Sequence, residues 1–80
     1  MRMLMKVKVP TEAGNHALKD GILQKVFGEF AKQWNPEALY FIAEDGHRTA
    51  VTVFDMKDNS QMVQVAEPFF MAMNAEISWT

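Results

Sequence analysis

Residues 38–55 read ALYFIAEDGHRTAVTVFD, and this stretch decides the fold. Two runs rich in aromatic and β-branched residues, at 38–43 and 49–55, flank a short polar segment, which is typical of two strands and their turn. The pair Asp45-Gly46 tolerates the positive φ of a tight hairpin turn. The stretch therefore predicts a β-hairpin made of strands 2 and 3.

A long amphipathic helix is predicted before this hairpin. Pro10 ends the preceding strand, Thr11 can cap the helix, and Asn35-Pro36 stops it after Trp34. At 100° per residue, one half of the helical wheel is apolar. This half contains Leu18, Ile22, Leu23, Val26, Phe27, Phe30 and Trp34.

Three glycines recur at intervals of seven along this helix, at Gly14, Gly21 and Gly28, on a side away from the apolar half. Each costs about 1 kcal/mol relative to alanine in a helix interior. They are either tolerated surface glycines, with a fray or break near Gly14-Asn15, or a close contact with another backbone. We favour surface glycines, because an exposed glycine needs only to be tolerated.

The remaining elements lie at the two ends of the chain and between the hairpin and the last strand. Residues 3–9 and 75–80 alternate as strands 1 and 4. A second helix is predicted over residues 59–73, where Asp58 followed by Gln61 resembles a capping box. Pro68 lies inside this helix and predicts a kink or a split, because proline lacks the backbone donor.

The order β-α-β-β-α-β within 80 residues predicts one α+β domain over residues 1–80. Right-handed crossovers give a ferredoxin-like antiparallel sheet, strand order 4-1-3-2, with two helices on one face. On the helix-covered side we place Met5, Val7, Val9, Val51, Val53, Ile77 and Trp79. On the open face we place Leu4, Lys6, Lys8, Ala50, Thr52, Phe54, Glu76, Ser78 and Thr80.

This open face mixes apolar and charged side chains, so it suits neither water nor a dry core. A chain this short, without disulfides or a metal, is also expected to have a small free energy of unfolding as a monomer. We therefore predict a homodimer through the open sheet face, which hides the apolar part and encloses a lined space. Lys6 or Lys8 is expected near Glu76, across the pairing of strands 1 and 4.

Composition excludes several classes of function. The net charge is -2 and strand 1 has no aromatic residue, which argues against nucleic-acid binding through the sheet. With no cysteine and two histidines, we expect no metal site and no cofactor. No apolar run is long enough for a membrane span, and the first nine residues are too polar for a signal peptide, so a cytoplasmic location is expected.

Several single residues invite a functional interpretation beside a structural one. His47 and Arg48, at the hairpin turn, could bind an anion, and His16 could act as a base; we favour solvated side chains for all three. Tyr40 could donate to a substrate oxygen, although a half-buried strand tyrosine is commoner. Glu67 could carry a proton if buried, although a surface glutamate is favoured.

The order of elements, the segment Glu67-Pro68-Phe69-Phe70 and the hairpin at Asp45-Gly46 resemble the dimeric α/β-barrel superfamily. That group includes muconolactone isomerases, cofactor-free antibiotic-biosynthesis monooxygenases and stress-responsive barrel proteins. A closer resemblance, to a family of small uncharacterised bacterial proteins, lies in four segments: Asn35–Ala38, Arg48–Ala50, Asp55–Asp58 and Ala66–Phe70. Where stress-responsive members carry a histidine beside the proline, this chain has Glu67.

Two functions remain open. The first is a dimeric barrel that binds a small hydrophobic metabolite and, as the resemblance implies, could perform a cofactor-independent isomerisation or oxygenation; the residues leave open whether any reaction is catalysed. The second is a non-catalytic, self-associating structural or regulatory module. For the first, the predicted pocket lining is Lys6, Lys8, Tyr40, Phe54, Glu67 and Trp79.

Overall fold

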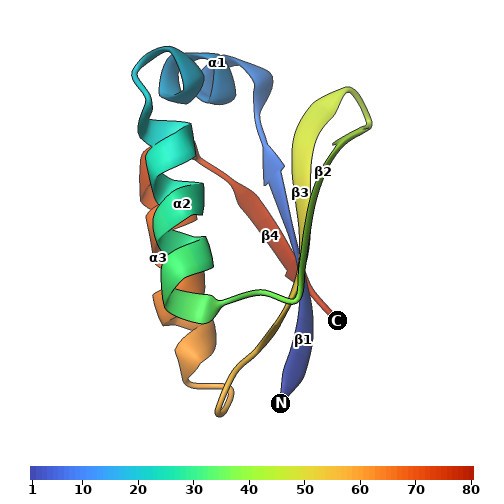
Figure 1. The fold of residues 1–80 in the computed structure, drawn as a ribbon. Coiled ribbons are helices and arrows are strands. Elements are labelled where there is room, and N and C mark those ends of the chain that lie inside the picture. Colours follow the sequence, from blue (N-terminus) through green and yellow to red (C-terminus); the bar gives the residue numbers. More distant parts are fainter.

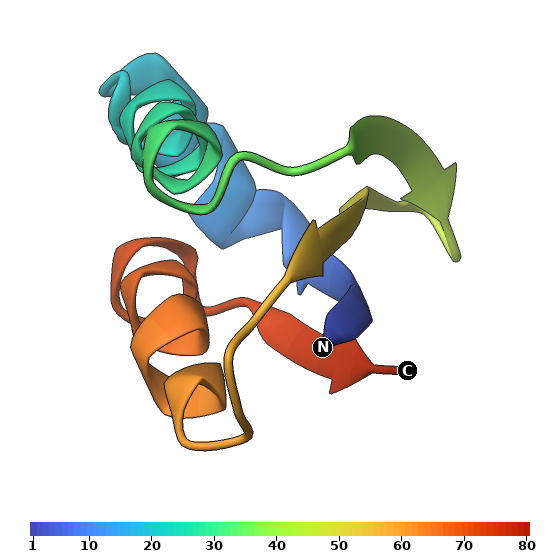
Figure 2. The same cartoon turned by 60° about the horizontal axis from the view of Figure 1, so that its bottom comes forward.

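Four antiparallel strands carry a layer of helices on one face (Figures 1 and 2). The computed structural model describes residues 1–80. Its elements are β1 (Arg2–Val9), α1 (Thr11–Lys19), α2 (Ile22–Trp34), β2 (Ala38–Glu44), β3 (His47–Asp55), α3 (Gln61–Met73) and β4 (Glu76–Trp79). The sheet order β2-β3-β1-β4 is the predicted order 4-1-3-2 read from the other edge, so the ferredoxin-like prediction is confirmed.

The β2–β3 hairpin closes through a two-residue turn. Asp45 (φ 54°) and Gly46 (φ 78°) both adopt the left-handed region, as a type I′ turn requires. This turn is as short as a hairpin allows, so His47 and Arg48 already belong to β3. The hairpin was predicted correctly, but these two residues are strand residues and not turn residues.

The predicted long helix is two helices, α1 and α2. They separate at Asp20–Gly21, where Gly21 has a φ of 75° that residues other than glycine rarely adopt. Gly14, where a break was one option, is helical and buried inside α1. The break lets α1 turn away from the axis of α2 at one end of the sheet (Figure 1).

The third helix, α3, begins at Gln61 and continues through Pro68 without being split, contrary to one form of the prediction. The expected capping box does not form at its start, where the N-cap residue is Ser60 and makes no side-chain cap hydrogen bond. The Asp58 carboxylate accepts hydrogen bonds from the backbone N–H of Ser60 (2.8 Å) and from the Ser60 hydroxyl, while Gln61 Oε1 accepts from Lys57 N (2.7 Å).

The two faces of β3 are the reverse of those predicted. Met3, Met5 and Val7 of β1 pair with Phe54, Thr52 and Ala50, which places these β3 residues on the helix-covered side. Val51 and Val53 therefore lie on the open face. Antiparallel pairing fixes this, because directly paired residues project to the same side of a sheet. From here on the open face comprises Leu4, Lys6, Lys8, Ala38, Tyr40, Ile42, Glu44, His47, Thr49, Val51, Val53, Glu76 and Ser78.

Phe54 lies in the core and not on the open face, with 1% of its surface exposed. Its ring centroid lies 5.2 Å from that of Phe30, 5.9 Å from Trp34 and 6.1 Å from Trp79. These edge-to-face and tilted contacts fill the end of the core where α2 terminates. A polar side chain on this covered side, Thr52, is satisfied by donating to the carbonyl of Ala38 (2.9 Å).

Candidate functional site

A cleft of about 580 Å³ opens between the helices and the β2–β3 hairpin. We call it the hairpin cleft. Its lining residues are Val9, Thr11, Leu23, Phe27, Phe41, Ile42, Ala43, Gly46, His47, Arg48, Thr49 and Ala50. A volume of a few hundred Å³ with mostly apolar walls is typical of small-molecule sites.

The cleft exists because the helices leave the β2 edge partly uncovered. Phe41 pairs with Ala50 and therefore projects toward the helices, where its ring meets Phe27 edge-to-face at 5.0 Å. Even so, 59% of Phe41 is exposed. Leaving an aromatic ring in water on the core side of a sheet costs free energy that a bound apolar group would recover.

One end of the cleft is basic. Arg48 pairs with Val9 and Ala43, so it projects to the helix side, and its guanidinium lies against α1 at Gly14. An added Cβ on Gly14 would stand 3.0 Å from Arg48 Nη1. Arg48 is half-buried, and its guanidinium is within ion-pair or hydrogen-bond distance of no group in the chain.

His47 contributes to the wall of the cleft, but it pairs with Glu44, so its side chain projects to the open face; its Nδ1 is buried without a hydrogen-bond partner in the chain. Its carbonyl oxygen accepts a hydrogen bond from the Thr49 hydroxyl (3.2 Å). A buried nitrogen with no partner is uncommon, because the lost hydration is not replaced. The cleft therefore joins apolar walls to one cationic side chain with unused hydrogen-bonding capacity, that of Arg48.

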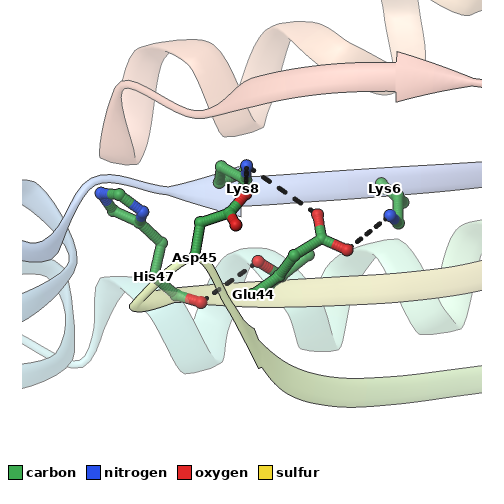
Figure 3. A network of polar contacts seen from close by, with 6 residues as sticks. Lys6, Lys8, Glu44, Asp45 and His47 are labelled. Carbon is green, nitrogen blue, oxygen red and sulfur yellow. Dashed lines mark hydrogen bonds and ion pairs between the residues drawn. The ribbon is translucent and has the colours of Figure 1, made fainter.

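The open face carries a different arrangement, an ionic network (Figure 3). Lys6 Nζ lies 2.6 Å from Glu44 Oε1, and Lys8 Nζ lies 3.1 Å from Asp45 Oδ2 and 3.8 Å from Glu44 Oε2. The hydrogen bond that Lys8 donates to Asp45 raises the pKa of Lys8; desolvation opposes this, and the charges of Asp45, Glu44 and Glu76 add to it. The lysines thus pair mainly with the hairpin, although Glu76 is the strand neighbour of Lys8.

A shallow hollow of about 260 Å³ lies beside this network. Its lining consists of Lys6, Lys8, Glu44, Glu76, Ile77 and Ser78. Because both lysines already have carboxylate partners, little positive charge is left for a ligand there. The hollow is also mostly polar, in contrast to the hairpin cleft.

The structure does not bring the six predicted lining residues together. Lys6, Lys8 and Tyr40 lie on the open face. Phe54 is in the core, and Trp79 is half-buried against it on the helix-covered side. Glu67 is exposed on α3, in the helix layer, so it is not a buried proton carrier.

The sequence interpretation missed most of the hairpin cleft. It named His47 and Arg48 as anion-binding candidates but favoured solvated turn residues. The signal that was available is the length of the turn: a two-residue loop at Asp45-Gly46 makes Arg48 a strand residue that shares a side with Ala50. Nothing in the residue pattern indicated that Phe41 would remain exposed.

The remaining features add few groups with functional chemistry. His16 is exposed on α1. No three side chains among His, Cys, Asp and Glu gather in a way that could hold a metal ion. None of the helices combines the length and the apolar character needed to traverse a bilayer.

Comparisons with known proteins bear on the fold alone. No family model matches the chain, and no curated protein matches it. Among solved structures, it is similar to the de novo designed protein Ferredog-Diesel, with a TM-score of 0.55 and 13% sequence identity. The likeness covers 100% of this chain and 84% of the designed one. At this identity, the similarity supports the architecture and carries no function.

Proposed function

We propose that the protein binds a small, mostly apolar molecule in the hairpin cleft. The observation that carries this proposal is Phe41, a ring on the core side of the sheet that stays 59% exposed beside a cleft of about 580 Å³. Leu23 and Phe27 of α2 form the opposite wall. A ligand lying between these walls would complete the packing that the helices leave unfinished.

The proposal concerns binding and includes no reaction. Among the cleft residues, His47 alone carries an imidazole, the commonest general acid or base, and that imidazole projects to the open face. A catalytic imidazole needs a partner that fixes its orientation, and no carboxylate lies within 4.0 Å of His47. The isomerase or oxygenase chemistry implied by the resemblance therefore has no further support from the cleft.

The test uses N-phenyl-1-naphthylamine, a neutral dye whose emission rises in apolar surroundings. The wild-type chain should bind it saturably at one site per chain. Ala43→Trp should weaken binding by about tenfold or more, because an indole on this exposed strand position would fill the cleft. Large aromatic residues are favoured in strands, so the substitution is compatible with β2.

Ala38→Trp is the matched control, since it makes the same change on the same strand but on the open face. It should leave the affinity for the dye within about twofold of wild type. An absence of saturable binding by the wild type would refute the proposal. Equal affinity in Ala43→Trp and wild type would place the dye elsewhere and refute it too.

A second candidate function, self-association, is favoured by the composition of the open face. Its apolar side chains include Tyr40 (64% exposed) and Ile42, with Val51, Val53 and Leu4 beside them. The ion pairs of Lys6 and Lys8 neutralise charge within each chain, so two open faces could meet without strong repulsion. A homodimer through this face would cover the apolar side chains and is compatible with an occupied hairpin cleft.

A further inference from the structure

We infer that the ligand of the hairpin cleft is an amphipathic carboxylate, held by Arg48 at its anionic end and by Phe41 and Phe27 along its apolar body. This inference rests on the proposed function and adds the chemical class of the ligand. The cationic side chains of the sheet differ in whether an anionic partner lies beside them.

Arg48 has no anionic partner, whereas other basic residues of the sheet have one. Arg2 binds Glu37 through two nitrogens (2.7 and 2.9 Å), Lys6 binds Glu44, and Lys8 binds Asp45. Arg48 is also half-buried, so its charge has lost part of its hydration without compensation. A partly buried guanidinium in this condition favours an anion brought by another molecule.

The guanidinium of Arg48 lies in space that a glycine of α1 leaves open. Gly14 leaves the space that it occupies, since a Cβ there would stand 3.0 Å from Nη1 and 2.9 Å from Val9 Cγ1. Val9 is buried and cannot move away easily. The glycine thus leaves room for the guanidinium beside α1, at one end of the cleft.

The polar groups around Arg48 suit a single carboxylate. A planar guanidinium presents two parallel N–H donors that match the two oxygens of a carboxylate. Thr11 lines the same cleft and can add a hydrogen bond. Glu12, in the first turn of α1, is not within 4.0 Å of Arg48, so the guanidinium remains free for the ligand.

The apolar walls of the cleft determine the chemical character of the rest of the ligand. Leu23, Phe27, Phe41 and Ala43 supply apolar wall and no charge. A ligand with charge along its whole length would lose hydration there without a partner. One anionic end and an apolar body therefore match the lining, as in a medium-chain or aromatic monocarboxylate.

The experiment displaces bound N-phenyl-1-naphthylamine from the full chain with decanoate or with decan-1-ol. These compounds share an apolar chain and differ in the head group. Decanoate should displace the dye at a concentration about ten- to hundredfold lower than decan-1-ol, the range expected for charge-assisted hydrogen bonds. Arg48→Gln should abolish this preference and leave the midpoint for decan-1-ol within about twofold.

Two further variants separate binding from folding. Arg48→Lys keeps the charge but not the paired donors, and it should retain part of the preference for decanoate. Arg2→Gln removes an arginine that is paired with Glu37, outside the cleft, and it should change neither midpoint.

Three results would contradict either the carboxylate inference or the proposed function, and they can be told apart. Equal displacement by decanoate and decan-1-ol overturns the carboxylate inference and leaves the apolar cleft standing. An equal loss of both ligands in Arg48→Gln would assign Arg48 to the structure of the cleft and would also overturn the inference. If the dye itself fails to bind the wild type, the proposed function fails first.

Discussion

Gly14, Gly21 and Gly28 stand at equal intervals, yet they occupy three different environments. A Cβ on Gly14 would meet Val9 and Arg48, Gly21 has a left-handed backbone, and a Cβ on Gly28 would meet no other part of the chain within 4 Å. The surface interpretation thus holds for Gly28, and the close-contact interpretation holds in altered form for Gly14, whose neighbours are side chains. Equal spacing on a helix cannot distinguish these cases, because the neighbours come from distant segments.

Gly14 and Gly28 both lie within helices and have a helical φ, and they give a pair of opposite predictions. Gly28→Ala should raise the free energy of unfolding by up to about 1 kcal/mol, because alanine favours the helix and meets no obstacle. Gly14→Ala should lower it by about 1 kcal/mol, since overpacking against buried Val9 exceeds the same helix gain. Urea unfolding at one protein concentration measures both. Equal stabilisation by the two substitutions would contradict the close approach at Gly14.

For Arg48, the sequence indicated the chemistry of the side chain but not its orientation in the fold. Its type suggested anion binding, and its place next to a turn suggested a solvated side chain. The orientation depended on the turn being two residues long and on the pairing of Arg48 with Val9, which places it on the helix-covered side. The length of the turn could have been predicted from Asp45-Gly46. The lack of a carboxylate beside Arg48 could not, because it depends on how distant segments pack in the folded chain.

Among the elements, β3 shows why periodicity succeeded in locating a strand and failed in orienting it. Both of its faces are apolar, with Val51 and Val53 on one side and Ala50 and Phe54 on the other. Period-2 alternation then gives no sign of the buried face, and the larger number of valines suggested the wrong one. β1 alternates with lysines, and its faces were predicted correctly for that reason.

The start of α3 gives a prediction about pH. The hydrogen bonds from the Ser60 hydroxyl and backbone N–H lower the pKa of Asp58 from its ordinary value of 3.8. A carboxylate whose pKa is lowered by folding stabilises the fold above its unfolded-state pKa, and this contribution is lost as the pH falls through the folded-state pKa. Wild type should therefore lose more stability between about pH 5 and acid than Asp58→Asn does.

Thermal unfolding across this pH range measures the difference between wild type and Asp58→Asn. Ser60→Ala keeps the carboxylate but removes the hydroxyl donor, so it should show a pH dependence between those of the other two. Parallel pH profiles for wild type and Asp58→Asn would show that the interaction does not stabilise the folded chain.

For the whole molecule, the sheet order followed from the sequence, because short connections and right-handed crossovers leave few alternatives for β-α-β-β-α-β. The composition of the two faces did not follow, and the predicted dimer surface changes accordingly. Phe54, once expected at the centre of that surface, is buried within the chain. Val51, between Lys6 on β1 and Tyr40 on β2, occupies the central place instead.

Self-association therefore has a corrected test. Wild type should sediment as a dimer at micromolar concentration, and Val51→Lys should shift it toward monomer by placing unpaired charges at the two-fold contact. Val63→Lys, at a 68% exposed position of α3 in the helix layer, is the control and should remain dimeric. A wild type that sediments as a monomer at this concentration would exclude the dimer and leave the cleft proposal intact.

The packing of Trp34 and Trp79 around Phe54 also determines which changes the tryptophan fluorescence of the chain can detect. The indoles of this protein both lie near the end of α2, each about 6 Å from the ring of Phe54. Leu23, on the wall of the hairpin cleft, is about 16 Å from Trp34 along the helix axis, at about 1.5 Å per residue. Intrinsic emission should therefore follow global unfolding, and occupancy of the cleft by a ligand that does not absorb at the emission wavelengths of tryptophan should change it little.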